Sequence, residues 1–149
     1  MGRRVHVAGV GMIPFTKPGK GDDYFVMGER AIVAALADAG VAYDLVQQAY
    51  AGYVYGDSTS GQAAVYRVGL TGIPIVNVNN NCATGSTALW LARQAVESGA
   101  AECVLAVGFE QMQPGALKPK WTDRPSPTQF INDLRDELHP PREAHLAQR

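Results

Sequence analysis

The residues best suited to covalent chemistry lie in the stretch "VNVNNNCATGSTALWLARQAV", residues 76–96. Its cysteine, Cys82, lies between an apolar run and a pattern with helical periodicity. The first N–H groups of a helix lack partners, and together with the helix macrodipole they favour negative charge. Because the thiolate is the nucleophilic form of cysteine, we expect Cys82 to attack an electrophilic carbon.

The neighbours of this cysteine are small or amide-bearing. Ala83 and Gly85 leave space for a substrate carbonyl and offer backbone N–H groups to a developing oxyanion, a contribution that can be worth about 3 kcal/mol of barrier. The asparagines at 79–81 can hold a tight turn through side-chain hydrogen bonds. We therefore predict Asn81, Ala83 and Gly85 as oxyanion or turn support around Cys82.

A second cysteine, Cys103, lies in the apolar run "CVLAV". Free cysteine is among the most buried residue types, and an isolated one is more often core than catalyst. That interpretation suits Cys103 and suits Cys82 poorly, because the neighbours of Cys82 are polar or very small. Two cysteines 21 residues apart form neither a disulfide framework nor a metal-ligand pattern, so we expect no metal site.

Composition narrows the class of protein. The chain has 149 residues, 46% hydrophobic and 18% charged, with a formal net charge of −1, which is typical of a globular protein. Neither sign of charge forms a long block, so nothing indicates a nucleic-acid partner, and no apolar run reaches the length of a membrane span. The low cysteine count favours a reducing, intracellular compartment.

Strand-like and helix-like segments alternate along the first 112 residues. We predict strands over 5–10, 46–56, 72–78 and 103–107, and helices over about 23–39, 62–68 and 82–98. The order βαβαβαβ predicts an α/β fold with a mostly parallel sheet covered by helices. Residues 1–112 form the expected α/β domain, and 113–149 are expected to be a loop followed by a charged, poorly packed tail.

The block "NNNCATGSTALWLARQAVESGAAECVLAVGFEQM" resembles the thiolase superfamily, in particular its sterol carrier protein x group of SCP-2 thiolases and lipid-transfer proteins. The resemblance extends back through "GDSTSGQAAVYRVGLTGIPIVNV" and "VHVAGVGMIPFTKPG", over about residues 4–127. It implies a thiolase-like N-terminal half, and it maps the nucleophile of the family onto Cys82.

The resemblance also implies a reaction. Members of the family cleave a 3-oxoacyl-CoA with coenzyme A, or run the reverse reaction, through an acyl thioester on the nucleophilic cysteine. A coenzyme A thioester is then the substrate, and no permanently bound cofactor is implied. The resemblance further implies a homodimer that pairs through the strand around Ile75 to Val78, and some relatives use an accessory acyl-CoA-binding subunit.

Several catalytic motifs of the family are not found in this sequence: Gly-His-Pro, His-Asp-Cys-Phe and a glycine-rich cysteine loop. The histidines present are His6 near the N-terminus and His139 and His145 in the tail, and we expect His139 to be a surface residue. The chain therefore matches less than half of a family member, and the expected function is thiolase-type acyl transfer by a truncated chain whose activity alone is in question.

Two alternatives remain open from sequence. One is a non-catalytic module that dimerises or binds acyl-CoA or lipid, which the missing histidine motifs favour. The other is a steroid side-chain retro-aldolase subunit on the same fold. The family resemblance implies the cytoplasm if the source is bacterial and allows the peroxisome if it is eukaryotic.

Overall fold

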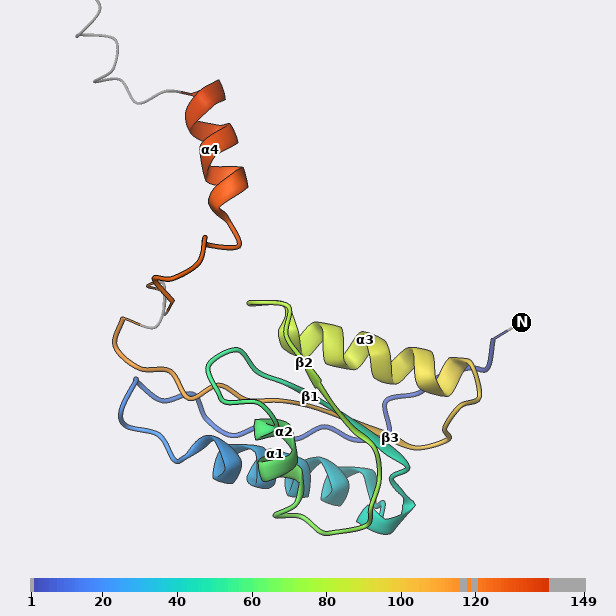
Figure 1. Cartoon of the computed structure of the whole chain (residues 1–149). Coiled ribbons are helices and arrows are strands. Elements are labelled where there is room, and N and C mark those ends of the chain that lie inside the picture. Colours follow the sequence, from blue (N-terminus) through green and yellow to red (C-terminus); the bar gives the residue numbers. More distant parts are fainter. Residues whose placement is uncertain (1, 116–117, 119–120, 140–149) are drawn as a thin grey trace, which may run out of the picture. The chain divides into compact units, whose positions relative to one another are not determined.

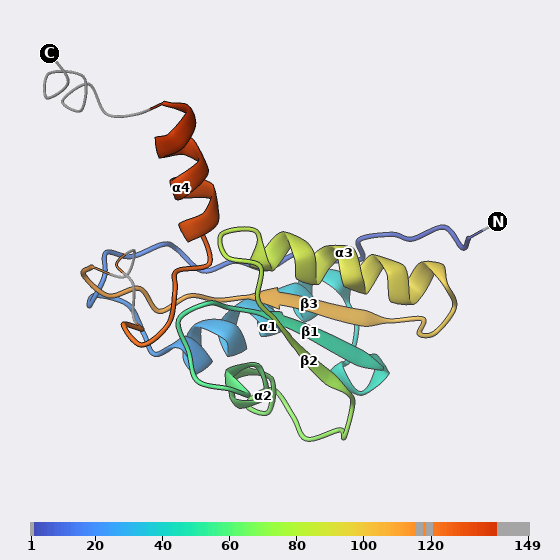
Figure 2. The ribbon, with the colours of Figure 1, turned by 45° about the horizontal axis from the view of Figure 1, so that its top comes forward.

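A parallel sheet of three strands forms the centre of the first of two compact units, Met1–Pro114 and Gly115–Arg149. The computed structural model describes residues 2–115, 118 and 121–139. The strands are β1 (Gln48–Gly52), β2 (Ile75–Val78) and β3 (Val104–Gly108), and they lie side by side in the order β2-β1-β3 (Figure 1, Figure 2). Both strand pairs are parallel, which confirms the predicted α/β class.

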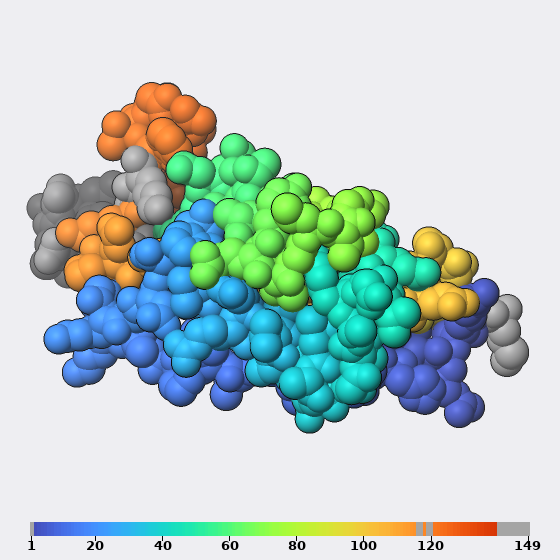
Figure 3. Space-filling view, turned by 90° about the horizontal axis from the view of Figure 1, so that it is seen from below, coloured from blue at the N-terminus to red at the C-terminus, as the bar shows by residue number. Residues whose placement is uncertain are grey.

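Helices cover both faces of this sheet. α3 (Thr84–Glu97) packs on all three strands from one face, while α1 (Tyr24–Ala39) and α2 (Ser60–Val65) pack on the other (Figure 1). A short 3-10 turn, η1 (Tyr43–Leu45), leads from α1 to β1. Figure 3 shows the outer face formed by α1 in blue to cyan and α2 in green. The sheet is therefore buried on both sides, as its apolar strands require.

Small side chains allow these layers to approach closely. Ala49 and Ala51 of β1 and Ala64 of α2 are fully buried. The largest fully buried side chains are Ile32 of α1 and Val65 of α2, each worth roughly 1.5–3 kcal/mol when removed from water. The core between the sheet and α1 and α2 combines these alanines and branched side chains with the stacked rings of Tyr53 and Phe109.

Glycine ends the first helix. α1 follows Asp23 and stops at Gly40, whose φ of 63° places it in the left-handed region. Glycine adopts this conformation without steric cost, and the Gly40 N–H donates to the carbonyl of Ala37 at 3.2 Å. The chain can therefore turn back toward β1.

The predicted first strand, residues 5–10, is not a strand, so the order βαβαβαβ is wrong at its first element. A strand requires a neighbour that exchanges backbone hydrogen bonds, and the described part of the chain pairs β3 only with β1. The segment instead packs on α1: a Cβ at Gly9 would lie 2.4 Å from the Ala39 nitrogen. The segment is not buried, because Val7 and Val10 are 71% and 69% exposed.

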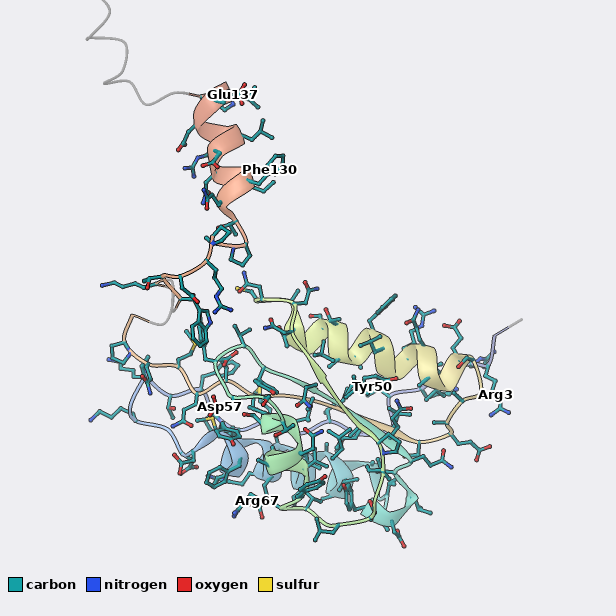
Figure 4. All side chains as sticks on the ribbon, viewed as in Figure 1. Arg3, Tyr50, Asp57, Arg67, Phe130 and Glu137 are labelled. Carbon is teal, nitrogen blue, oxygen red and sulfur yellow. The ribbon has the colours of Figure 1, made fainter. Side chains whose placement is uncertain are left out.

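The second unit contains one helix, α4 (Gln129–Leu138), within its described residues. The helix lies in the segment predicted to be a poorly packed tail, and none of its residues is buried. Figure 4 shows Phe130 projecting from it, 74% exposed. Before α4, the Arg124 guanidinium lowers the pKa of the Asp123 carboxyl from its usual value, and Asp123 raises the pKa of Arg124.

The described helices include none long and apolar enough to cross a membrane. The predicted division of the chain into an α/β domain over 1–112 and a loop with a tail over 113–149 stays a prediction.

Candidate functional site

A tight turn, residues 79–83, connects the carboxyl end of β2 to α3. Asn81 has a φ of 48°, in the left-handed region that asparagine tolerates better than most residues. The side-chain oxygen of Asn79 accepts the Asn81 N–H at 3.2 Å. The amide side chains thus hold a turn that places the next residue, Cys82, outside the edge of the sheet.

A second asparagine ties the turn to the helix. The Asn80 side-chain nitrogen donates to Thr87 Oγ1 at 2.9 Å, and that hydroxyl donates to the carbonyl of Ala83, also at 2.9 Å. The carbonyl of Asn80 accepts the Ala83 N–H at 3.0 Å. Side-chain and backbone bonds therefore fix the turn against the first turn of α3.

The thiol of Cys82 is exposed to solvent. Its one hydrogen-bond contact among the described residues is weak, to the side-chain oxygen of Asn81 at 3.8 Å from the sulfur. The carboxyl ends of parallel strands are the edge where α/β proteins bind ligands. The sulfur is therefore accessible to an electrophile on the side of the sheet where a substrate is expected.

The N–H groups near the sulfur differ in their availability. The N–H groups of Ala83 and Thr84 donate to the carbonyls of Asn80 and Asn81, at 3.0 and 3.1 Å. The N–H of Gly85 has no acceptor among the described residues. A Cβ at Gly85 would meet no atom within 4 Å. Of the two amides that the sequence indicated, Gly85 is the one free to bind an oxyanion.

No acid or base group is hydrogen-bonded to Cys82 in the described residues. His6 is exposed in the N-terminal segment, and His139 is exposed in the second unit, directly after α4. His145 lies outside the described residues. The described chain also contains no cluster of three or more histidine, cysteine or acidic side chains that could hold a metal ion.

The other cysteine has a different environment. Cys103 precedes β3 at the amino end of the sheet and is partly buried against the core. Its carbonyl accepts the Gln47 N–H at 2.9 Å.

Sequence reasoning missed a cavity of about 770 Å³ in the first unit, beyond the end of β3. The N-terminal loop over 11–22, part of α1 and the segment over 108–113 line it. Its apolar lining includes Met12, Met27 and Phe109. The loop 11–22 has glycine and proline spacing that predicts turns, and no local pattern shows which distant residues it faces.

Comparisons with known proteins agree with the fold. The family model "Thiolase, N-terminal domain" matches residues 5–132. Sterol carrier protein 2 of Homo sapiens is 58% identical over 135 residues, which cover 89% of this chain and 25% of that protein. Non-specific lipid-transfer protein-like 2 of Caenorhabditis elegans is 50% identical over 117 residues, 77% of this chain and 28% of that protein.

A more distant relative is the benzoylsuccinyl-CoA thiolase subunit BbsB of Thauera aromatica, 34% identical over 72% of this chain and 28% of its own. Among solved structures, the acetyl-CoA acetyltransferase of Bacillus anthracis has a TM-score of 0.54 at 20% identity, covering 79% of this chain and 31% of its own. That likeness shows the fold alone. The chain spans about a quarter of the length of the curated relatives it matches.

Proposed function

The chain belongs to the thiolase family, in whose N-terminal domain it lies, and from that premise we propose that it accepts an acyl group from a coenzyme A thioester onto Cys82. The observation that carries this proposal is the exposed thiol in the turn just before α3, at the carboxyl edge of a parallel sheet, with the unengaged N–H of Gly85 three residues further along the chain. The chemistry is covalent, nucleophilic acyl transfer.

The proposed thiolysis has two steps. In the first, the Cys82 sulfur attacks the 3-oxo carbonyl carbon, the bond between C2 and C3 breaks, and the released acetyl-CoA carbanion takes a proton. In the second, the thiol of coenzyme A attacks the acyl-cysteine, the new thioester leaves, and the Cys82 thiol is restored. The N–H of Gly85 supports the oxyanion of each tetrahedral intermediate.

Proton transfer in this reaction needs an acid/base group, and none contacts Cys82 among the described residues. The transfer from an acyl-CoA to the thiol alone makes a smaller demand, because the leaving group is itself a thiolate. We therefore expect this chain to perform that half-reaction more readily than full thiolysis.

The test is incubation of the full chain with acetyl-CoA, followed by peptide mapping by mass spectrometry. The expected result is a thioester on Cys82 that hydroxylamine removes. Cys82→Ala should abolish the adduct, whereas Cys103→Ala should leave it unchanged. Equal acylation of both cysteines, or no acylation of Cys82, would exclude this proposal.

A second candidate function is the binding of an acyl chain without chemistry, and the cavity beyond β3 favours it. Its lining is rich in methionine and phenylalanine, which adapt to flexible chains. Among its charged groups, Arg30 pairs with Asp22 at 2.7 Å. Glu110 accepts the N–H groups of Val54 and Tyr55 at 2.9 and 2.8 Å. That leaves Lys17 without an ion pair in the described chain, available for an anionic head group.

This second candidate predicts binding of a fluorescent fatty acid that Met27→Trp weakens by filling the cavity. Cys82→Ala should bind as the wild type does, because Cys82 does not line the cavity. Val33→Trp is a matched control, since Val33 lies on the same helix, is 51% exposed and does not line the cavity. Equal affinity for all three variants would exclude a binding site in this cavity.

We further propose that the chain forms a homodimer through β2. In the described residues this strand pairs with β1 on one side only, and Val76 is 40% exposed on it. An open strand edge favours pairing with a second copy. Light scattering should give a dimer mass for the wild type and a monomer mass for Val76→Lys. Leu70→Lys is the control, because Leu70 is 80% exposed, and it should keep the dimer mass. A monomeric wild type would contradict this proposal.

A further inference from the structure

Thr84 is the first residue of α3, and its side chain is only 5% exposed. Among the described residues, the only other buried polar side chain is that of Ser60. Its Oγ1 accepts the Asn80 N–H at 2.9 Å and donates to the carbonyl of Asn81 at 2.5 Å. That carbonyl belongs to the peptide bond that joins Asn81 to Cys82. One buried hydroxyl therefore holds the two residues that immediately precede the sulfur-bearing residue.

The Thr84 side chain also packs against the sheet. A Cβ at Gly52, the last residue of β1, would lie 2.8 Å from the Thr84 Cγ2 and 2.9 Å from the Thr84 carbonyl oxygen. Only a residue without a side chain allows this approach. The methyl of Thr84 thus packs against strand backbone while its hydroxyl faces the turn.

The Thr84 hydroxyl helps to hold Asn81 in an unfavourable backbone conformation. Asn81 is in the left-handed region at φ 48°, which costs free energy for residues other than glycine. Such a conformation persists when surrounding bonds determine it. The bond from the Thr84 hydroxyl to the Asn81 carbonyl is one of these bonds, and it acts on the peptide unit next to Cys82.

We propose that Thr84 is a positioning residue for Cys82: its hydroxyl fixes the turn over residues 80–82 and so holds the exposed thiol in place just before α3. This inference rests on the proposed role of Cys82 as the acyl acceptor. It assigns no contact between Thr84 and a substrate, because Thr84 is buried and acts through the backbone of residues 80–82.

The test compares Thr84→Val, which keeps the shape and removes the hydroxyl, with Thr84→Ser, which keeps the hydroxyl. The readout is the rate of alkylation of Cys82 by iodoacetamide, followed by mass spectrometry on the full chain. Alkylation depends on the thiolate and on its surroundings, which the turn holds in place, so we expect Thr84→Val to react about tenfold more slowly. Thr84→Ser should restore the rate to within about twofold of the wild type.

Ser60→Ala is the matched control. Ser60 is 3% exposed, begins α2 and donates its hydroxyl to the Asp57 carbonyl at 2.9 Å, so the substitution removes an equally buried hydroxyl elsewhere. The Cys82 rate of this variant should match the wild type. Circular dichroism and the thermal unfolding midpoint confirm that each variant is folded at the labelling temperature.

Three results would overturn the proposal: an unchanged rate in a folded Thr84→Val, a Thr84→Ser variant as slow as Thr84→Val, or an equal loss in Ser60→Ala. If Thr84→Val does not fold, a slow Thr84→Ser overturns the proposal and a normal one supports it. Failure of the proposed function would give a different result: wild-type Cys82 would be alkylated but never acylated by acetyl-CoA. That result would exclude acyl transfer without contradicting the effect of Thr84 on the Cys82 alkylation rate.

Discussion

The two cysteines lie at opposite ends of one parallel sheet and differ in almost every physical respect. Cys82 follows β2 at the carboxyl end, is exposed, and belongs to a turn held by amide and hydroxyl side chains. Cys103 precedes β3 at the amino end and packs against the apolar core. The same type of side chain is therefore exposed at one end of the sheet and packed against the core at the other.

The difference follows from the polarity of a parallel sheet. Chains leaving the carboxyl ends enter turns that lead to helices, so unpaired N–H groups gather at that edge. Chains entering at the amino ends arrive from helix carboxyl ends, where carbonyls are in excess and an anion is not stabilised. Unpaired N–H groups are consequently expected at the edge where Cys82 lies and not at the edge where Cys103 lies.

The largest effect expected from this comparison is in native-state alkylation. Iodoacetamide should modify Cys82 faster than Cys103 by on the order of tenfold or more, because the partly buried thiol reacts only after local opening. In denaturant the two rates should converge, as measured by time-resolved peptide mapping. Equal rates in the folded protein would remove the distinction between the two sites.

Weakening the core should affect only one of the two cysteines. Ile32 is 1% exposed and lies in the core against which Cys103 packs, so Ile32→Ala should lower the free energy of unfolding by about 3 kcal/mol. Urea denaturation measures that loss. Native alkylation of Cys103 should accelerate markedly while that of Cys82 stays constant; an equal acceleration at both sites would show that Cys82 also depends on core opening.

Local signals explain what the sequence predicted correctly. Apolar periodicity indicated all three helices of the first unit and the three paired strands, and glycine marked helix ends at Gly40 and Gly99. The segment over 5–10 has the same apolar character as a strand, but strand formation depends on a neighbour elsewhere in the chain. Composition could not report that this segment forms no ladder with β3, which in the described residues pairs only with β1.

The candidate site divides in the same way. The position of Cys82 between a strand and a helix followed from residue order, and so did its small neighbours. The burial of the Thr84 hydroxyl depends on the close approach of Gly52, a residue 32 positions away in the chain. The free N–H of Gly85 and the engaged N–H of Ala83 differ only through turn geometry. Contacts of this kind depend on the three-dimensional structure and leave no local pattern in the sequence.

A smaller effect is expected from the turn that exposes Cys82. Asn81→Val places a β-branched residue at φ 48°, which should cost roughly 1–2 kcal/mol of folding free energy and slow Cys82 alkylation. Asn81→Gly tolerates the same φ and should retain stability within a few tenths of a kcal/mol. Urea denaturation and alkylation rates of both variants test this, and a valine variant as stable as the glycine variant would show that the turn relaxes freely.

The smallest effect should come from the ion pair on the face of the sheet opposite α3. Arg67, labelled in Figure 4, pairs with Glu29 of α1 and lies over the Phe25 ring at 5.1 Å from its centroid. Because the Arg67 side chain is 44% exposed, solvent screens the charge, and Arg67→Gln should cost at most about 1 kcal/mol. High salt should shrink the difference further, and both cysteine rates should stay unchanged. A loss that matches Ile32→Ala would mean that the contact between α1 and α2 depends on this pair rather than on the alanine-lined core.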